Sequence, residues 1–434
     1  MAGTTVALPA RAGREWAGRP GLLVWYGVLV LLIAFGLAAW IYELETGLAA
    51  TGMRDVVSWG MYIFTFAFFI GLSAGGLIMA SSAEVFGVNA LKPLSRLGVL
   101  SAAGCVAVAA IMIIPDLGRP DRILNLVTHP NWSSPLIWDI VIITVYFIFS
   151  VVDLTVLQRH HLDQSALRRT ARVLAFVGLP TAVLLHSVTA WIFGLQISRA
   201  WWNTSLMAPL FVVSAILSGT GLVTLLALAA ERWGGLVVPD DTKRWLRGLI
   251  AVSLLVDLFF VGSDYVTILW GNVPAARSAI DLILPGGPWS WLFWGEWIVG
   301  GVVPLAFLLL PRLRRLPGSL GFAALLVVAG VYFFRIELVI IGFVNPLVQY
   351  PPGNAVGTYS PTTSSFELVG RYSPTWVEYG IVLGLVAVFL AIVTVGYRAL
   401  GLGSRRPAGG RDGDGRVETA SRTNGGSTAV TGGS

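Results

Sequence analysis

Long apolar runs separated by short polar segments make up most of this chain. A helix needs about 20 apolar residues to cross the hydrocarbon core of a membrane. Ten stretches approach or exceed that length: 22–42, 58–83, 97–115, 135–157, 172–193, 207–230, 247–270, 289–311, 318–341 and 375–398. The first is too long for the apolar core of a signal peptide. The pattern therefore predicts an all-α, polytopic membrane protein with about ten transmembrane helices.

The order of these stretches predicts how they group. Two of them open with proline, tryptophan and an acidic residue, at Pro135 and at Pro288, which fits two related four-helix bundles over residues 57–193 and 207–341. Helices 22–42 and 375–398 would flank them within a membrane domain of residues 21–403. Residues 1–20 are predicted to form a cytoplasmic segment. Residues 404–434 are rich in Gly, Ser and Thr and are predicted to be a disordered cytoplasmic tail.

Composition and charge agree with a membrane location. Hydrophobic residues make up 56% of the chain and charged residues 12%, against about 25% charged in soluble proteins. The net charge of +6 flanks the apolar runs, so we expect lipid rather than nucleic acid as the partner. Of 29 Lys and Arg residues, 22 lie on the N-terminal side of the predicted membrane and only 6 in the opposite loops. Both termini are therefore predicted to be cytoplasmic.

A polar hinge at residues 111–139 separates the third and fourth apolar stretches. It holds four prolines and several charged residues, a composition that ends helices. The charge count places its central part, Asp116–Ser134, on the outer side. Two further outer loops, residues 271–288 and 342–374, are long and rich in Pro, Tyr and Asn, and loops of this kind are often functional. We expect a docking surface for a partner there, although they could only connect helices.

Several redox centres are excluded by residue counts. Cys105 is the only cysteine, too few for an iron–sulfur cluster, and His186 is the only one of four histidines inside a predicted span. A haem held between membrane helices commonly takes two histidines. The chain is therefore expected to hold neither haem, nor an iron–sulfur cluster, nor a metal.

Ionisable residues inside a membrane are costly and are functional candidates by default. Asp139 lies about 6 Å and His186 about 10 Å below the outer ends of their helices, at 1.5 Å per residue. Asp116 ends the preceding span, and Tyr62 could join them from the second. The alternatives are a hydrogen-bonded structural imidazole at His186 and a water-exposed interface position for Asp139.

A second group of ionisable residues suggests either a proton path or a structural ion-pair network. Arg335 needs a carboxylate nearby, because a lone guanidinium is not tolerated in lipid. Asp264 or Glu296 is a better partner than Glu337, which lies two residues away on another helix face. The whole group comprises Glu84, Asp153, Asp257, Asp264, Glu296, Arg335 and Glu337.

Several motifs resemble the NrfD/PsrC-like family, the membrane subunits of polysulfide reductase and formate-dependent nitrite reductase, in its ten-helix form. The resemblance covers about residues 57–398 and also extends to the hydrogenase-2 and alternative complex III membrane subunits. The matching segments are Trp59-Gly60 with Gly71-Leu-Ser-Ala-Gly75-Gly76, Asp116-Leu-Gly118-Arg119-Pro120, Ser134-Pro135 with Trp138, and Arg199-Ala-Trp-Trp-Asn203 with Pro209. Trp294-x-Glu296, Pro304 and Arg335 match more loosely.

The resemblance implies a quinone-reactive anchor in a bacterial or archaeal cell membrane. Its partners would be a ferredoxin-like iron–sulfur subunit and a catalytic subunit, a molybdopterin or nickel–iron enzyme, on the outer face. We expect Asp139 and His186 to act as ligands and proton acceptors for menaquinone or ubiquinone, because these side chains can titrate near neutrality. Asp116 would support them, and Tyr62 and Trp59 would line the ring pocket. Arg119 is expected to brace the hinge by pairing with Asp116 or Asp139.

Two other functions remain open at this point. A secondary transporter or ion channel would use Asp257, Asp264, Glu296 and Arg335 at the membrane midplane, but neither the inverted repeats nor the broken helices of many transporters are visible. A purely structural anchor with a degenerate quinone site is the other.

Overall fold

The structure is a computed structural model that describes residues 20–162, 167–347, 349–350, 366–367 and 370–403. Ten helices of this part are long and apolar enough to cross a membrane, which confirms the predicted all-α membrane fold. The predicted tail at 404–434 lies outside the described residues. The elements are α1 (Pro20–Thr46), η1 (Leu48–Ala50), α2 (Met61–Val85), η2 (Asn89–Leu94), α3 (Ser95–Asp116), η3 (Pro120–Arg122), α4 (Asn125–Thr128), α5 (Pro135–Leu162), α6 (Arg168–Gly194), α7 (Met207–Ala229), η4 (Ala230–Gly234), α8 (Asp240–Gly271), α9 (Pro274–Ile283), α10 (Ser290–Phe293), η5 (Trp294–Val302), α11 (Val303–Leu309), α12 (Pro311–Arg314), α13 (Ser319–Val344), β1 (Gln349–Tyr350), β2 (Phe366–Glu367) and α14 (Trp376–Ala399).

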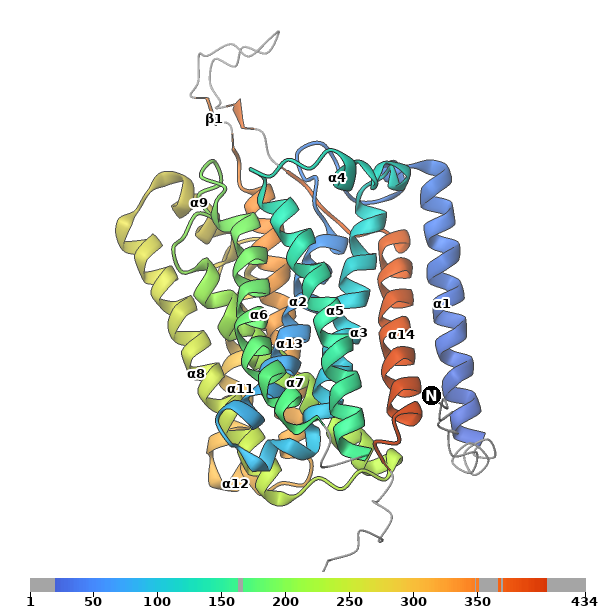
Figure 1. Cartoon of the computed structure of the whole chain (residues 1–434). Helices are drawn as coiled ribbons and strands as arrows, with labels where there is room; N and C mark the ends of the chain where they lie inside the picture. The colour runs from blue at the N-terminus through green and yellow to red at the C-terminus, as the bar shows by residue number, and fades with distance from the viewer. Residues whose placement is uncertain (1–19, 163–166, 348, 351–365, 368–369, 404–434) are drawn as a thin grey trace, which may run out of the picture. The chain divides into compact units, whose positions relative to one another are not determined.

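By their contacts, eight of the membrane helices are described here as two groups of four that meet at α2 and α7. Helices α14 and α1 lie at one side of the assembly (Figure 1). Helices α2, α3, α5 and α6 form the first bundle; α7, α8, α13 and the η5–α11 helix form the second. Helix α2 contacts α7 and α13 as well as its own bundle. Of the most apolar stretch of α2, 89% of the residues are buried, as expected for a helix that is apolar on all sides. The outer pair, α1 and α14, pack on each other, and α14 also contacts α3.

Small residues allow the two bundles to touch. A methyl group placed on Gly75 of α2 would lie only 2.3 Å from the carbonyl oxygen of Ala215 and 2.5 Å from the Cα of Gly219, both in α7. Small residues at such positions let membrane helices approach at backbone distance. The contact fixes α2 against α7, and it therefore fixes where the polar residues of both bundles meet.

The two ends of the helical assembly differ in composition. The end that carries residues 117–134 is called the hinge end here, and the end that carries Lys92, Arg159, Lys243 and Arg312 the basic end. At the hinge end, β1 and β2 pair antiparallel. The predicted 271–288 loop contains the ordered helix α9, whereas most of the predicted 342–374 loop lies outside the described residues.

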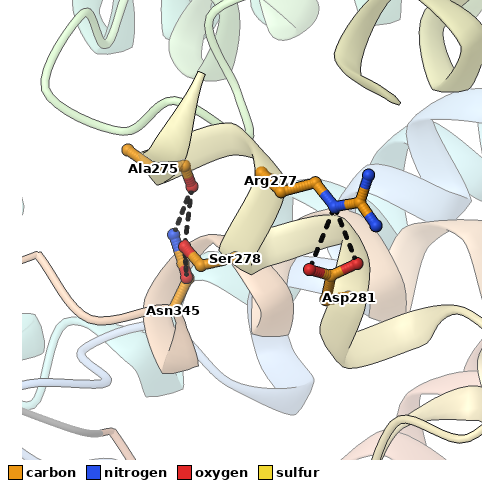
Figure 2. Close-up of polar contacts among 5 residues, drawn as sticks. All are labelled: Ala275, Arg277, Ser278, Asp281 and Asn345. Carbon is orange, nitrogen blue, oxygen red and sulfur yellow. Dashed lines mark hydrogen bonds and ion pairs between the residues drawn. The ribbon is translucent and has the colours of Figure 1, made fainter. Parts of the chain in front are cut away.

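Side chains tie α9 to the end of α13 (Figure 2). The hydroxyl of Ser278 donates to Asn345 Oδ1 at 2.8 Å, and Asn345 Nδ2 donates to the carbonyl of Ala275 at 3.0 Å. Arg277 and Asp281 form an ion pair at 3.0 Å along the exposed side of α9. The hinge end therefore presents a fixed, charged helix to the solvent side.

Candidate functional site

Asp139 and His186 belong to one contact region between α5 and α6. The hydroxyl of Thr189 donates to Asp139 Oδ1 at 2.6 Å. His186 lies three residues before Thr189 on α6, so the two side chains lie on the same helix face. Asp139 is 2% exposed and His186 1% exposed. Asp139 and His186 are thus both buried where α5 and α6 meet, in the hinge-end half of the first bundle.

Near Gly71 of α2, the side chain of His186 comes close to side chains of the second bundle. A methyl group placed on Gly71 of α2 would lie 3.9 Å from His186 Nε2, 3.8 Å from Arg335 Nη2 and 3.6 Å from Ser218 Oγ. His186 Nε2 makes no hydrogen bond with any residue that the structure describes. The two groups of ionisable residues that the sequence suggested separately therefore adjoin at this point.

Arg335 is fully buried and is held mainly by neutral groups. Its Nη2 donates to Ser214 Oγ at 2.7 Å, and its guanidinium carbon lies 3.8 Å from the ring centre of Phe211 and 4.9 Å from that of Phe334. Stacking of a cation on aromatic rings is favourable where water is excluded.

The expected direct ion pair of Arg335 is wrong within the described residues. No carboxylate there lies within 4.0 Å of its nitrogen atoms. Asp264 instead accepts a hydrogen bond from Thr204 at 2.7 Å, near the hinge end. Asp257 and Glu296 act on Arg335 electrostatically from a longer distance.

Three buried carboxyl groups share the second bundle with Arg335. Glu337 accepts a hydrogen bond from the hydroxyl of Tyr265 at 2.8 Å. Glu296, in the π-helix η5, neighbours both Glu337 and Asp257. All three acids are less than 9% exposed. Because π-helical segments are frequent at functional sites, the position of Glu296 is notable.

Tyr62 and Asp116 belong to a different cluster from the one predicted. The hydroxyl of Tyr62 donates to the carboxylate of Glu43 in α1. Asp116 lies within electrostatic range of Glu43 and of Glu378 in α14. Glu378 accepts hydrogen bonds from Tyr372 at 2.5 Å and from the Gly52 amide at 2.7 Å. The flanking helices thus supply an acidic cluster at the hinge end.

Glu43 and Glu378 were missed although the sequence carried the signal. Glu378 lies inside the 375–398 stretch, and Glu43 directly follows the 22–42 stretch. Both are buried, at 3% and 0% exposed. The rule that singled out Asp139 applies equally to them.

Arg119 does not brace the hinge as predicted. It pairs with Asp121 at 3.0 Å, and both side chains are more than half exposed. Gly118 adopts a φ of +61°, a left-handed turn that glycine makes without strain. After this turn, the nearest acid to Arg119 is Asp121. The guanidinium and its hydrogen bonds hold the pKa of the Asp121 carboxyl below its ordinary value.

The Arg199–Asn203 turn joins three helix ends. Arg199 Nη1 donates to the carbonyl of Gly342 at 2.6 Å, and Trp202 Nε1 donates to that of Leu338 at 2.7 Å, both in α13. Asn203 Nδ2 donates to the carbonyl of Gly194 at the end of α6, at 3.1 Å. Burial lowers the pKa of Arg199 below its ordinary value.

An aromatic cluster lies directly beside this turn. The ring of Trp59 stacks on that of Trp202 with centres 5.9 Å apart, and it meets Phe193 and Phe343 edge-on. Trp59 is therefore part of a packed aromatic layer that contacts the end of α6, the helix carrying His186.

Helix α5 begins at Pro135, directly after the turn at Ser134. Proline is tolerated at the first position of a helix, because its missing amide hydrogen would have no partner there.

Asp153 and Glu84 lie toward the basic end. Asp153 is 4% exposed on α5. Tyr146 and Ser150 precede it by seven and three residues, so all three lie on one helix face. The hydroxyl of Tyr146 donates to the carbonyl of Ser73 at 3.0 Å. Glu84 forms a partly exposed ion pair with Lys92 at 3.5 Å.

Known proteins share sequence similarity with most of this chain. A family model described as "Polysulphide reductase, NrfD" matches residues 49–346. The chain is 37% identical, over 88% of its length and 92% of the relative, to a putative membrane subunit of dimethyl sulfoxide reductase from Halobacterium salinarum. It is 28% identical, over 86% and 92%, to the Hdr-like menaquinol oxidoreductase integral membrane subunit of Archaeoglobus fulgidus.

A third relative is a subunit of the selenate reductase of Mesobacillus selenatarsenatis, 24% identical over 86% of this chain and 92% of the relative. The family match covers more than half of the chain, including the hinge, the Arg199–Asn203 turn and Arg335. The chain belongs to the family described as "Polysulphide reductase, NrfD".

Proposed function

We propose that this chain is the quinone-reactive membrane subunit of a respiratory oxidoreductase complex. The observation that carries the proposal is the buried pair Asp139 and His186, in which His186 Nε2 has no hydrogen-bond partner among the described residues. Relatives named as a menaquinol oxidoreductase subunit and a menaquinone reductase subunit support it. In this proposal menaquinone or ubiquinone is a substrate that enters and leaves.

The chemistry requires proton acceptors beside the quinone ring. A quinol that is oxidised to a quinone loses two electrons and two protons. Asp139 and His186 would hydrogen-bond the two ring oxygens and accept the protons, because general acid–base groups must lie within hydrogen-bond reach. Trp59 lies in the aromatic layer at the end of α6 and would border the ring. Tyr62 and Asp116 have other contacts, so in this proposal they serve the Glu43 cluster instead.

The electrons must leave through another subunit. We infer a ferredoxin-like iron–sulfur subunit, linked to a molybdopterin or nickel–iron catalytic subunit, docked at the hinge end. The ordered helix α9 and the fixed Arg199–Asn203 turn offer a rigid surface for it. Co-isolation tests this: purification of the tagged chain should bring down an iron–sulfur protein and bound quinone. A chain that purifies alone and moves a substrate in liposomes would favour a transporter instead.

Orientation follows from charge and has its own test. We propose that the hinge end faces outward from a bacterial or archaeal cell membrane, since the loops of the basic end carry most Lys and Arg residues. A reporter that is active only in the cytoplasm should be active when fused after Arg405 and silent when placed near Gly353. The reverse pattern would move the quinone site to the cytoplasmic side.

A proton relay through the interior is part of the same proposal. His186 and Arg335 adjoin at Gly71, and the second bundle supplies Asp257, Glu296 and Glu337 beyond Arg335. Asp153 and Glu84 would extend a route through the first bundle toward the basic end, and Asp264 would serve the hinge end. Such a relay would link quinol oxidation to proton movement.

A further inference from the structure

A small cavity lies inside the second bundle, between α7, α8, η5 and α13. Its volume is about 10 Å³, and two of its lining residues are acids, Asp257 and Glu296. The remainder of the wall is apolar and consists of Leu217, Leu254, Leu258, Gly300, Val327, Gly330, Val331 and Phe334. Two acidic side chains therefore face a cavity whose other walls are apolar.

The polar atoms at this cavity have few partners in the protein. Asp257 Oδ1 and both carboxyl oxygens of Glu296 are buried and receive no hydrogen bond from a donor group in the described part of the chain. Glu296 lies within hydrogen-bond reach of one other carboxyl, that of Glu337, which can pair with only one of its oxygens. The two side chains are only 8% and 6% exposed. Buried polar atoms almost always have a partner, either in the protein or in ordered water. Asp257 Oδ1 and the Glu296 oxygen that is not paired with Glu337 thus point to a bound hydrogen-bond donor.

One wall of the cavity is formed by a helix segment with π-helical geometry. Residues Trp294–Val302 form a π-helix, which is wider than an α-helix. A methyl group on Gly300 would lie 2.3 Å from the Cα of Gly330, so η5 and α13 touch at that level. Gly300, Gly330 and Glu296 all line the cavity.

We propose that this cavity is a binding site for one water molecule, which bridges Asp257 and Glu296. A water needs about 10–15 Å³ and two to four polar partners, and the cavity offers both. Metal binding fits less well, since no group of three metal-binding side chains occurs among the described residues. A monovalent cation would also be repelled by the nearby guanidinium of Arg335, which acts on both acids.

The water would join separate parts of the polar network. Asp257 is on α8 and Glu296 on η5, and Glu296 neighbours Glu337, which accepts from Tyr265. One bridging water would make these groups a continuous hydrogen-bonded chain across the second bundle. Any role of that chain in proton transfer rests on the proposed function, whereas the presence of the water does not.

Structures of the full-length chain in its isolated complex, at a resolution that shows ordered water, test the site directly. The wild-type density should contain one peak within about 2.7–3.2 Å of both carboxyl groups, in sodium buffer and in choline buffer alike. Val331→Leu adds a methylene group to the cavity wall and should remove the peak. Val328→Leu, on the same helix but outside the cavity wall, should retain it.

Two results would overturn the proposal. One is wild-type density without a peak between Asp257 and Glu296. The other is a peak seen in sodium but not in choline buffer, which would identify a cation. Both readouts are independent of quinone turnover, so a failed water site is distinguishable from a failed quinone assignment.

Discussion

The two bundles bury their ionisable groups in opposite ways. In the first bundle, the contact between α5 and α6 holds one acid, Asp139, and one imidazole, His186, and Thr189 satisfies one oxygen of the acid. The second bundle gathers Arg335 with three acids, and many of their polar atoms have no partner among the described residues. Each charge costs at least about 2.5–3.5 kcal/mol at the centre of a membrane helix. The sparse pair suits contact with a ligand, and the dense network suits holding charge internally.

The largest expected effect comes from the first bundle. Asp139→Asn keeps the shape and the Thr189 contact but removes the proton-accepting carboxylate. Quinone-linked turnover should fall by about 10²-fold or more, as expected for loss of a general base, while the complex still assembles. His186→Leu should act similarly and weaken inhibition by quinone analogues. Turnover assays and co-purification measure activity and assembly separately.

The matched control for that prediction is Asp121→Asn. Asp121 is also a hinge-end acid, but it is exposed and forms a surface ion pair with Arg119. Its replacement should leave turnover and assembly unchanged. Parental turnover in Asp139→Asn and His186→Leu would remove the first bundle from the chemistry, and the comparison between bundles would lose its functional meaning.

Features that depend on neighbouring residues in the sequence could be predicted, whereas contacts between distant helices could not. The apolar runs predicted the ten helices, because their length and hydrophobicity are local properties. Asp139, His186 and Arg335 were found because a polar residue in an apolar run is also a local signal. The adjacency of His186 and Arg335 at Gly71 was not predictable, since it depends on how α2 packs between the bundles.

The errors at the hinge have the same origin. Arg119 was expected to reach Asp116 or Asp139, but the left-handed turn at Gly118 leaves it beside Asp121. Tyr62 was assigned to the quinone pocket because the second span could bring it to Asp139 and His186. Burial of Glu43 at the α1–α2 contact gives Tyr62 a different partner. Side-chain direction depends on tertiary packing, which the spacing of residues alone does not determine.

The second prediction sharpens the comparison at the contact between the bundles. Gly75→Ala places a methyl group against backbone atoms of α7, so it should destabilise the protein by about 1–3 kcal/mol, as overpacking does. Gly71→Ala meets only atoms at 3.6 Å or more and should leave thermal stability nearly unchanged. Its methyl group would nevertheless lie between His186 and Arg335.

Gly71→Ala is therefore expected to lower quinone-linked turnover without unfolding the protein. Thermal unfolding of the two purified variants gives the stability order, and turnover is measured on the folded Gly71→Ala protein. If Gly71→Ala is as unstable as Gly75→Ala, the space at Gly71 is smaller than the structure indicates. If its turnover is normal, the adjacency of the two polar regions has no functional role.

The smallest expected effect is on energy coupling, and it concerns the second bundle alone. Glu296→Gln and Asp257→Asn remove a titrating proton but keep the side-chain volume, so uncoupled quinone turnover should remain largely intact. If the second bundle relays protons, the number of protons moved per electron in sealed vesicles should fall in both variants. On the basic-end side of Asp257, helix α8 carries Ile250 and Leu254, which belong to an apolar cluster. In the first bundle, by contrast, the polar residues Tyr146, Ser150 and Asp153 follow one another along α5.

Asp153→Asn therefore tests which bundle carries protons at the basic end. A lower proton-to-electron ratio in this variant as well would assign the basic-end half of the route to the first bundle. Ratios equal to the parent in Glu296→Gln and Asp257→Asn would leave the dense network as a structural device that neutralises Arg335.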